Sequence, residues 1–131
     1  MEPIMWEDQI LAYLIRGTVA PEKTVFPTPH EVELQVGFVV YRAGGIVAPH
    51  RHAPITRTIN RTCEVVLVKK GRCDVDLYAN TRVVVATREL CKDDLLLIVS
   101  GGHGFRMQED TVLLEIKQGP YLGLSEKELL Q

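Results

Sequence analysis

The chain has 131 residues, of which 46% are hydrophobic and 24% charged, with a formal net charge of −2. This length suits one domain with a buried core, and the composition is that of a soluble globular protein. The chain lacks the basic excess typical of proteins that bind nucleic acid or anionic membranes, so we expect neither as a partner.

The N-terminus carries charged residues among its apolar ones, and no apolar run approaches the roughly 20 residues of a membrane-spanning helix. Since no signal-peptide pattern is present, we expect a cytoplasmic protein. The three cysteines, Cys63, Cys73 and Cys91, lack CxxC spacing. We therefore expect reduced thiols rather than disulfides or a zinc ribbon.

The first predicted elements surround a proline-rich segment. Residues 9–16 fit a short helix or a strand about equally well, and we favour a strand. Residues 18–30 contain three prolines, which predicts a connecting loop. Residues 32–41 and 46–48 are rich in β-branched and aromatic side chains and are predicted to form two strands joined at Gly44 and Gly45.

The second half of the chain has a regular strand and turn pattern. Residues 62–69 and 72–78 flank Lys70 and Gly71, which predicts a β-hairpin. In its second arm Cys73, Val75 and Leu77 should be buried, while the alternating Asp74, Asp76 and Tyr78 should face water. Further strands are predicted at residues 82–90, 95–99 and 111–118, with turns near residue 80 and at 93–94, 101–104 and 109–110. The tail, residues 125–130, is predicted to form one or two helical turns with Ser125 as N-cap.

Eight or so short strands separated by turn residues predict an all-β barrel or sandwich. We expect one domain over residues 1–131, with an N-terminal strand and loop at 1–31, a barrel core at 32–119 and a tail at 120–131. Because residues 9–16 have no evident hairpin partner, we also expect a homodimer in which strand edges pair across a twofold axis.

Three histidines and one glutamate are candidates for a metal site. His50 and His52 are two residues apart in an extended stretch, so their side chains should project from one face and could chelate one ion. Glu64 has the same strand parity as Val66 and Val68, which predicts a carboxylate on the buried face. Such a carboxylate is costly unless an ion or a cationic side chain neutralises it.

Alternatives remain for each of these residues. A salt bridge to Arg51, Arg57 or Arg61 would neutralise Glu64 without a metal. A His-x-His sequence beside a proline can also be an exposed loop, and His103, which lies among glycines, can be a turn residue.

The spacing of these residues resembles that of the cupin family of small metal-binding β-barrels. Gly44 is followed by five residues and then His50-Arg51-His52, and Glu64 by six residues and then Gly71, as in the family's first motif. The gap from His52 to Glu64 is longer than is usual there. Residues 93–105 are similar to the second motif, without its opening glycine and its proline.

The resemblance implies a cupin-type jelly-roll barrel with His50, His52, Glu64 and His103 as metal ligands. The segment at residues 115–121 is similar to the end of small uncharacterised cupins associated with surface-polysaccharide pathways. Three imidazoles and a carboxylate suit Zn, Fe, Mn, Ni, Co or Cu better than Ca or Mg. Such an ion could act as a Lewis acid, a source of bound hydroxide or a redox centre.

Specificity is expected in the long loop between the ligands. Arg57 and Arg61 could bind a phosphate or carboxylate, although both would point away from Glu64 if residues 56–64 formed one regular strand. Phe105, after His103, could line a pocket or pack in the core. Glu115 and Lys117 share a face in the last predicted strand; we expect an outward ion pair, or an acid/base pair if that face is inward.

Three functions fit this set of residues. The first is an isomerase, epimerase or lyase acting on a small polar metabolite such as a sugar, in which turnover depends on Glu64. The second is an Fe- or Ni-dependent dioxygenase. The third is a metal-stabilised binding module without catalysis.

Overall fold

The structure is a computed structural model and describes residues 1–80 and 82–130. The chain divides into two compact units, Met1–Val19 with Arg61–Gln131, and Ala20–Asn60. We call the first the strand unit and the second the loop unit, and describe each by itself. The single-domain organisation stays a prediction.

The strand unit contains all the strands that the described residues form. They are β1 (Glu2–Trp6), β2 (Gln9–Ile15), β3 (Glu64–Lys70), β4 (Arg72–Tyr78), β5 (Val84–Cys91), β6 (Leu95–Ile98), β7 (Gly102–Met107) and β8 (Val112–Lys117). A 3-10 helix, η1 (Gly123–Glu126), follows and begins two residues before the predicted N-cap, Ser125. The all-β prediction is confirmed, because η1 is the only helix in the described part of the chain. Among those residues, no helix is long and apolar enough to cross a membrane.

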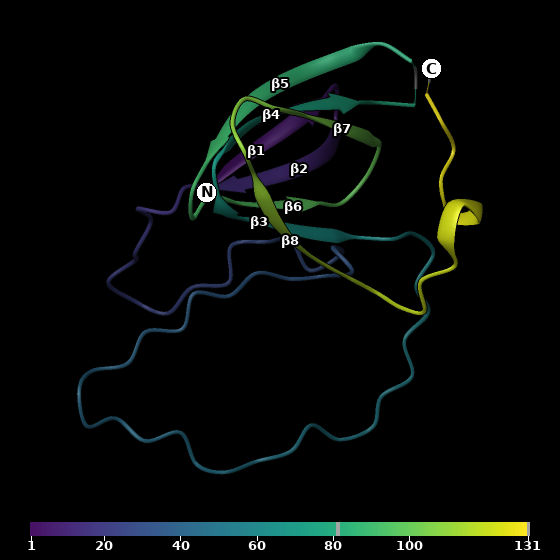
Figure 1. Cartoon of the computed structure of the whole chain (residues 1–131). Coiled ribbons are helices and arrows are strands. Elements are labelled where there is room, and N and C mark those ends of the chain that lie inside the picture. Colours follow the sequence, from purple (N-terminus) through teal and green to yellow (C-terminus); the bar gives the residue numbers. More distant parts are fainter. Residues whose placement is uncertain (81, 131) are drawn as a thin grey trace. The chain divides into compact units, whose positions relative to one another are not determined.

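Two antiparallel sheets form the layers of the strand unit (Figure 1). One has the order β1-β2-β6-β3-β8 and the other β5-β4-β7. Apolar side chains from both sheets pack between the layers. The sheets are not joined into a closed barrel in the part of the chain described, so of the two all-β alternatives the sandwich is the one observed.

The predicted hairpin at Lys70-Gly71 is wrong. β3 lies in the five-stranded sheet and β4 in the three-stranded sheet, so the turn carries the chain from one layer to the other. Gly71 has φ 82°, and a Cβ there would lie 2.5 Å from the Asp110 carbonyl oxygen. The glycine permits this tight crossover, whereas the sequence pattern resembled that of a local hairpin.

The strands predicted at residues 32–41 and 46–48 are not formed. In the loop unit Val25 and Phe38 make one isolated antiparallel bridge, with N···O distances of 2.9 and 2.8 Å. The chain around Val25 contains Pro27 and Pro29, which lack backbone donors and interrupt a continuous ladder. β propensity in residues 32–41 therefore finds no regular partner within this unit.

The alternation predicted for β4 is confirmed on its inner face and wrong in part on its outer face. Cys73, Val75 and Leu77 are fully buried. Asp76 on the other face is also buried, because Thr87 donates a hydrogen bond of 2.6 Å to its Oδ1 and Arg106 pairs with its Oδ2. These partners come from the flanking strands β5 and β7. The hydroxyl and the guanidinium together satisfy a carboxylate that was expected to face water.

The strand predicted at residues 9–16 is confirmed as β2, but the argument for a dimer through it is wrong. β1, which the sequence did not suggest, pairs with one edge of β2, and β6 pairs with the other. The open edges of this sheet in the described residues belong to β1 and β8 instead. A homodimer stays a prediction without this support.

Candidate functional site

Glu64 lies on the inner face of the five-stranded sheet, as its parity predicted. It opens β3, where it pairs in register with Ile98 of β6 and Lys117 of β8. Its residue surface is 7% exposed, and Val66 and Val68 on the same face are buried. The strand register therefore holds a carboxylate inside the sandwich, where it needs a cation or hydrogen-bond donors.

Two side chains supply that compensation. His103 Nε2 donates to Glu64 Oε2 over 3.0 Å, and Lys117 Nζ donates to Oε1 over 3.4 Å. The hydrogen bond from His103 lowers the pKa of Glu64 to about 2; burial acts in the opposite direction, and the charge of Lys117 adds to the lowering. Glu64 is therefore an anion at ordinary pH.

His103 belongs to a strand and not to the predicted turn. It is the second residue of β7 and pairs with Leu77, a buried residue of β4. The preceding Gly101, at φ 71°, makes the turn. Phe105 packs against the core two residues further on, with its ring centroid 5.6 Å from that of His103 in an edge-on contact. Phe105 thus supports the imidazole from the core side.

Lys117, for which the sequence favoured an outward position over an acid/base role, lies beside Glu64. Its register with Glu64, and that of Glu115 with Val66, places both side chains on the inner face, so the expected outward ion pair is wrong. Lys117 Nζ lies 3.0 Å from Glu115 Oε1 and 4.9 Å from the centroid of the Tyr121 ring. The hydrogen bond to Glu115 raises the pKa of Lys117, and the charges of Glu115 and Glu64 act in the same direction.

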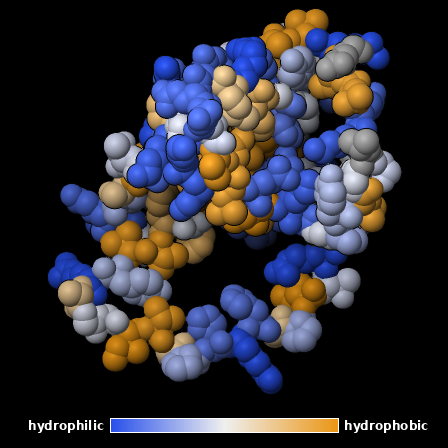
Figure 2. Space-filling view, in the orientation of Figure 1, coloured by the Kyte–Doolittle hydropathy of each residue, from blue (hydrophilic) through white to orange (hydrophobic). Residues whose placement is uncertain are grey.

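The two faces of β8 reverse the usual polarity of a strand in a water-soluble sheet. By register Glu115 and Lys117 lie on the inner face, with side chains 46% and 15% exposed, whereas Val112, Leu114 and Ile116 lie on the outer face and are between 44% and 55% exposed. Figure 2 shows apolar side chains at the surface where Figure 1 draws β8. The inner end of this sheet is therefore polar, with Glu64, His103, Lys117 and Glu115 forming what we call the inner polar cluster.

His50 and His52 lie together in the loop unit. Their ring centroids are 5.4 Å apart with an interplanar angle of 65°, and both residues are exposed. His50 Nδ1 is 2.9 Å from the Ala48 carbonyl oxygen, which can only accept a hydrogen bond. In the neutral imidazole this contact puts the proton on Nδ1 and leaves on Nε2 the lone pair with which an imidazole binds a metal.

The loop before β3 is irregular. Residues 51–63 form no strand, so the parity argument that turned Arg57 and Arg61 away from Glu64 does not apply. Both arginines are exposed. Their role in binding a substrate anion stays a prediction.

No family model, no curated protein and no solved structure matches this chain. The resemblance to cupins therefore depends on the motif residues alone.

The structure brings the predicted metal ligands together as two pairs. Glu64 and His103 meet in the strand unit, and His50 and His52 lie near each other in the loop unit. Taken by itself, neither unit gathers three His, Cys, Asp or Glu side chains around one point in its described residues. Imidazole nitrogens and a carboxylate are ligands of the kind that transition metals prefer, and the binding of one ion by these residues stays a prediction.

Proposed function

We propose that this chain is a cupin-type protein that binds one divalent transition metal and uses it in an isomerase, epimerase or lyase reaction on a small polar metabolite such as a sugar. The observation that carries the proposal is the buried Glu64 carboxylate, joined to His103 over 3.0 Å inside the sandwich. Both residues stand where the motifs require a ligand.

The course of the chain between the sheets supports a jelly roll. From β3 the chain passes to the opposite sheet for β4 and β5, returns for β6, crosses again for β7 and returns for β8. Repeated crossing of this kind builds the Greek keys of double-sheet jelly rolls.

Backbone conformation at the motif positions gives further support. Gly44 and Gly71, the glycines that bound the first motif, have φ of 80° and 82°. Asp93, which stands where the second motif has its opening glycine, has φ 70°. Three motif positions that call for glycine thus adopt the left-handed conformation that glycine favours.

The proposed ligands are His50, His52, Glu64 and His103. When bound, the ion would supply Lewis acidity that polarises a substrate carbonyl. The chain supplies the other parts: Lys117 Nζ can donate a hydrogen bond to a developing oxyanion, and Glu115 holds that ammonium group in place. Arg57 and Arg61 would bind an anionic group of the substrate.

The test is elemental analysis of protein purified without a histidine tag, followed by assays for isomerisation and elimination on sugars. We expect about one transition-metal ion per chain, lost in Glu64→Gln and in His103→Ala. The matched control is His30→Ala, since His30 is an exposed turn residue of the loop unit. Metal content that is absent from the wild type, or unchanged in both ligand variants, would contradict the proposal.

A second candidate is a binding module that uses the inner polar cluster without a metal. The observation that favours it is Lys117, whose ammonium group already compensates Glu64. Wild-type protein that contains no metal after purification, and binds none on titration with Zn, Ni, Mn or Fe(II), would favour this candidate.

A further inference from the structure

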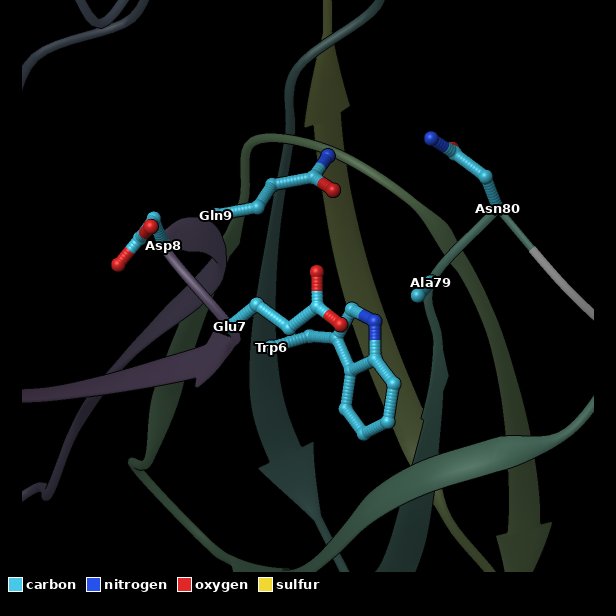
Figure 3. Close-up of a pocket in the computed structure, with 6 residues that line it drawn as sticks. All are labelled: Trp6, Glu7, Asp8, Gln9, Ala79 and Asn80. Carbon is cyan, nitrogen blue, oxygen red and sulfur yellow. The ribbon is translucent and has the colours of Figure 1, made fainter.

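A pocket of about 530 Å³ opens beside the turn between β1 and β2. Its lining residues are Trp6, Glu7, Asp8, Gln9, Ala79 and Asn80, none of which belongs to the inner polar cluster (Figure 3). The volume lies within the range of roughly 300–1,000 Å³ that is usual for small-molecule sites. The pocket is therefore large enough for a monosaccharide.

The side chains that face the pocket combine one aromatic surface with planar polar groups. In Figure 3 the indole of Trp6, the carboxylate of Glu7 and the amide of Gln9 extend to the same side of the turn, with Asn80 opposite. Asp8 points away from the others. Trp6 is 41% exposed, so a large part of the ring remains accessible to a ligand.

The walls of the pocket are held by contacts outside it. Gln9 Nε2 donates to Ser100 Oγ over 3.0 Å, and that hydroxyl donates to the Ile10 carbonyl over 2.6 Å, which fixes the orientation of the amide. The opposite wall follows the end of β4. There Gly101, at φ 71°, packs so closely on the Tyr78 carbonyl that a side chain would collide with it.

The turn that carries Trp6 and Gln9 is itself strained. Its first residue, Glu7, has φ 51°, a conformation that is uncommon for a residue with a long side chain. Strained residues of this kind persist where surrounding contacts impose them, and they cluster at binding sites. The strain and the Gln9–Ser100 contact together indicate a pre-formed site.

We propose that this pocket binds a neutral saccharide. The C–H face of a pyranose ring is apolar and can stack on the indole of Trp6. Vicinal hydroxyls act as both donors and acceptors, which matches the amides of Gln9 and Asn80 and the accepting carboxylate of Glu7. Binding here requires no metal, so the inference does not depend on the proposed catalytic function.

The charge of the lining residues narrows the ligand class. Glu7 and Asp8 are acidic, and no cationic side chain lines the pocket among the residues described. Phosphorylated or acidic sugars would be repelled. A cationic amine could be attracted by Trp6 and Glu7, but it would leave the donor groups of the two amides without acceptors.

Trp6 is the only tryptophan of the chain, so its emission reports directly on the pocket. The test is fluorescence titration with the methyl α-glycosides of glucose, galactose and mannose, with glucose 6-phosphate and with choline. We expect at least one methyl glycoside to give a saturable change with a Kd on the order of 1 mM. Asn80→Ala should weaken this binding about 5-fold, the effect of one lost neutral hydrogen bond.

The matched control is Asn60→Ala in the loop unit, which should leave the titration unchanged. Glu64→Gln should also leave it unchanged, so that failure of the metal proposal and failure of this one can be told apart. A saturable response to choline or to glucose 6-phosphate alone, no saturable response to any glycoside, or equal binding by Asn80→Ala and the wild type would each overturn the inference.

Discussion

Glu64 and His103 lie on strands of opposite sheets, and their side chains meet with Oε2 and Nε2 3.0 Å apart. The hydrogen bond therefore joins the two layers across the interior, beyond the contact made by apolar packing. It also leaves a buried carboxylate dependent on a partner that comes from the other sheet.

Removing the imidazole should destabilise the fold. His103→Ala deprives Glu64 of its shorter hydrogen bond while Lys117 remains, so we expect a loss of roughly 2 kcal/mol, below the 3–5 kcal/mol typical of a fully buried pair. Urea unfolding followed by circular dichroism measures the change. His30→Ala, at an exposed turn, should change the free energy of unfolding by less than about 0.5 kcal/mol. Similar stability of both variants would contradict a cross-sheet role for His103.

Asp94 should make stability depend on pH. It is buried and accepts hydrogen bonds from the Gly17 and Cys91 amides at 2.9 Å and from Arg16 at 2.7 Å. Burial raises its pKa, but these donors outweigh that effect and lower the pKa below the ordinary 3.8. Because the folded-state pKa is depressed, the stabilisation is complete above the unfolded-state value and is lost as pH falls through the folded-state value.

The measurement is the free energy of unfolding of the wild type and of Asp94→Asn between pH 6 and pH 2. We expect the substitution to cost roughly 2–3 kcal/mol near neutral pH, where charge-assisted hydrogen bonds are lost, and the difference to shrink on acidification below about pH 4. Asp8→Asn, at an exposed turn, is the control for a general effect of removing one negative charge. A difference that stays constant over this range would refute the assignment.

Asp93 is a position where glycine should be better than the native residue. Its φ of 70° lies in the left-handed region, which strains a residue with a Cβ. We expect Asp93→Gly to stabilise the protein by about 0.5–1 kcal/mol, since relief of strain exceeds the entropic cost of glycine. Thermal unfolding measures the change. Asp8→Gly, at a residue without positive φ, should not stabilise the protein. If both variants stabilise it equally, relief of backbone strain at Asp93 is not the cause.

The sequence predicts faces of strands better than their partners. Alternation with period two correctly placed Glu64 beside Val66 and Val68, because that pattern is a property of one strand alone. The prediction that β3 pairs with the next strand, β4, was wrong, because the turn at Gly71 is compatible with both a hairpin and a crossover. Sheet membership is decided by contacts between residues far apart in sequence.

The same limit explains why the outward position was wrongly favoured for Lys117. Lys117 enters the cluster through its register with Glu64, 53 positions earlier, and no local pattern reveals that pairing. His103 was recognised from its motif, although it lies in a strand and not in a turn. Motif spacing thus pointed to Glu64 and His103, whereas the position of the Lys117 ammonium group beside them is visible only in the fold.

The ammonium group of Lys117 should weaken the binding of a metal ion at Glu64. Lys117 Nζ is 3.4 Å from Glu64 Oε1, so a divalent cation at Glu64 would be repelled by a neighbouring positive charge. Lys117→Met keeps the length of the side chain and removes the charge. We expect Ni(II) or Zn(II) to bind about 10-fold more tightly to this variant, equivalent to about 1.4 kcal/mol. Isothermal titration calorimetry at pH 7 measures the affinity.

The control for this experiment is Lys69→Met, because Lys69 is an exposed residue of β3 with the opposite parity to Glu64. Its metal affinity should equal that of the wild type, and Glu64→Gln should abolish binding in the Lys117→Met background. If Lys117→Met binds the metal no better than the wild type, the ammonium group does not compete with an ion at Glu64. If neither protein binds the metal, the metal-free binding module is favoured over the metal-dependent enzyme.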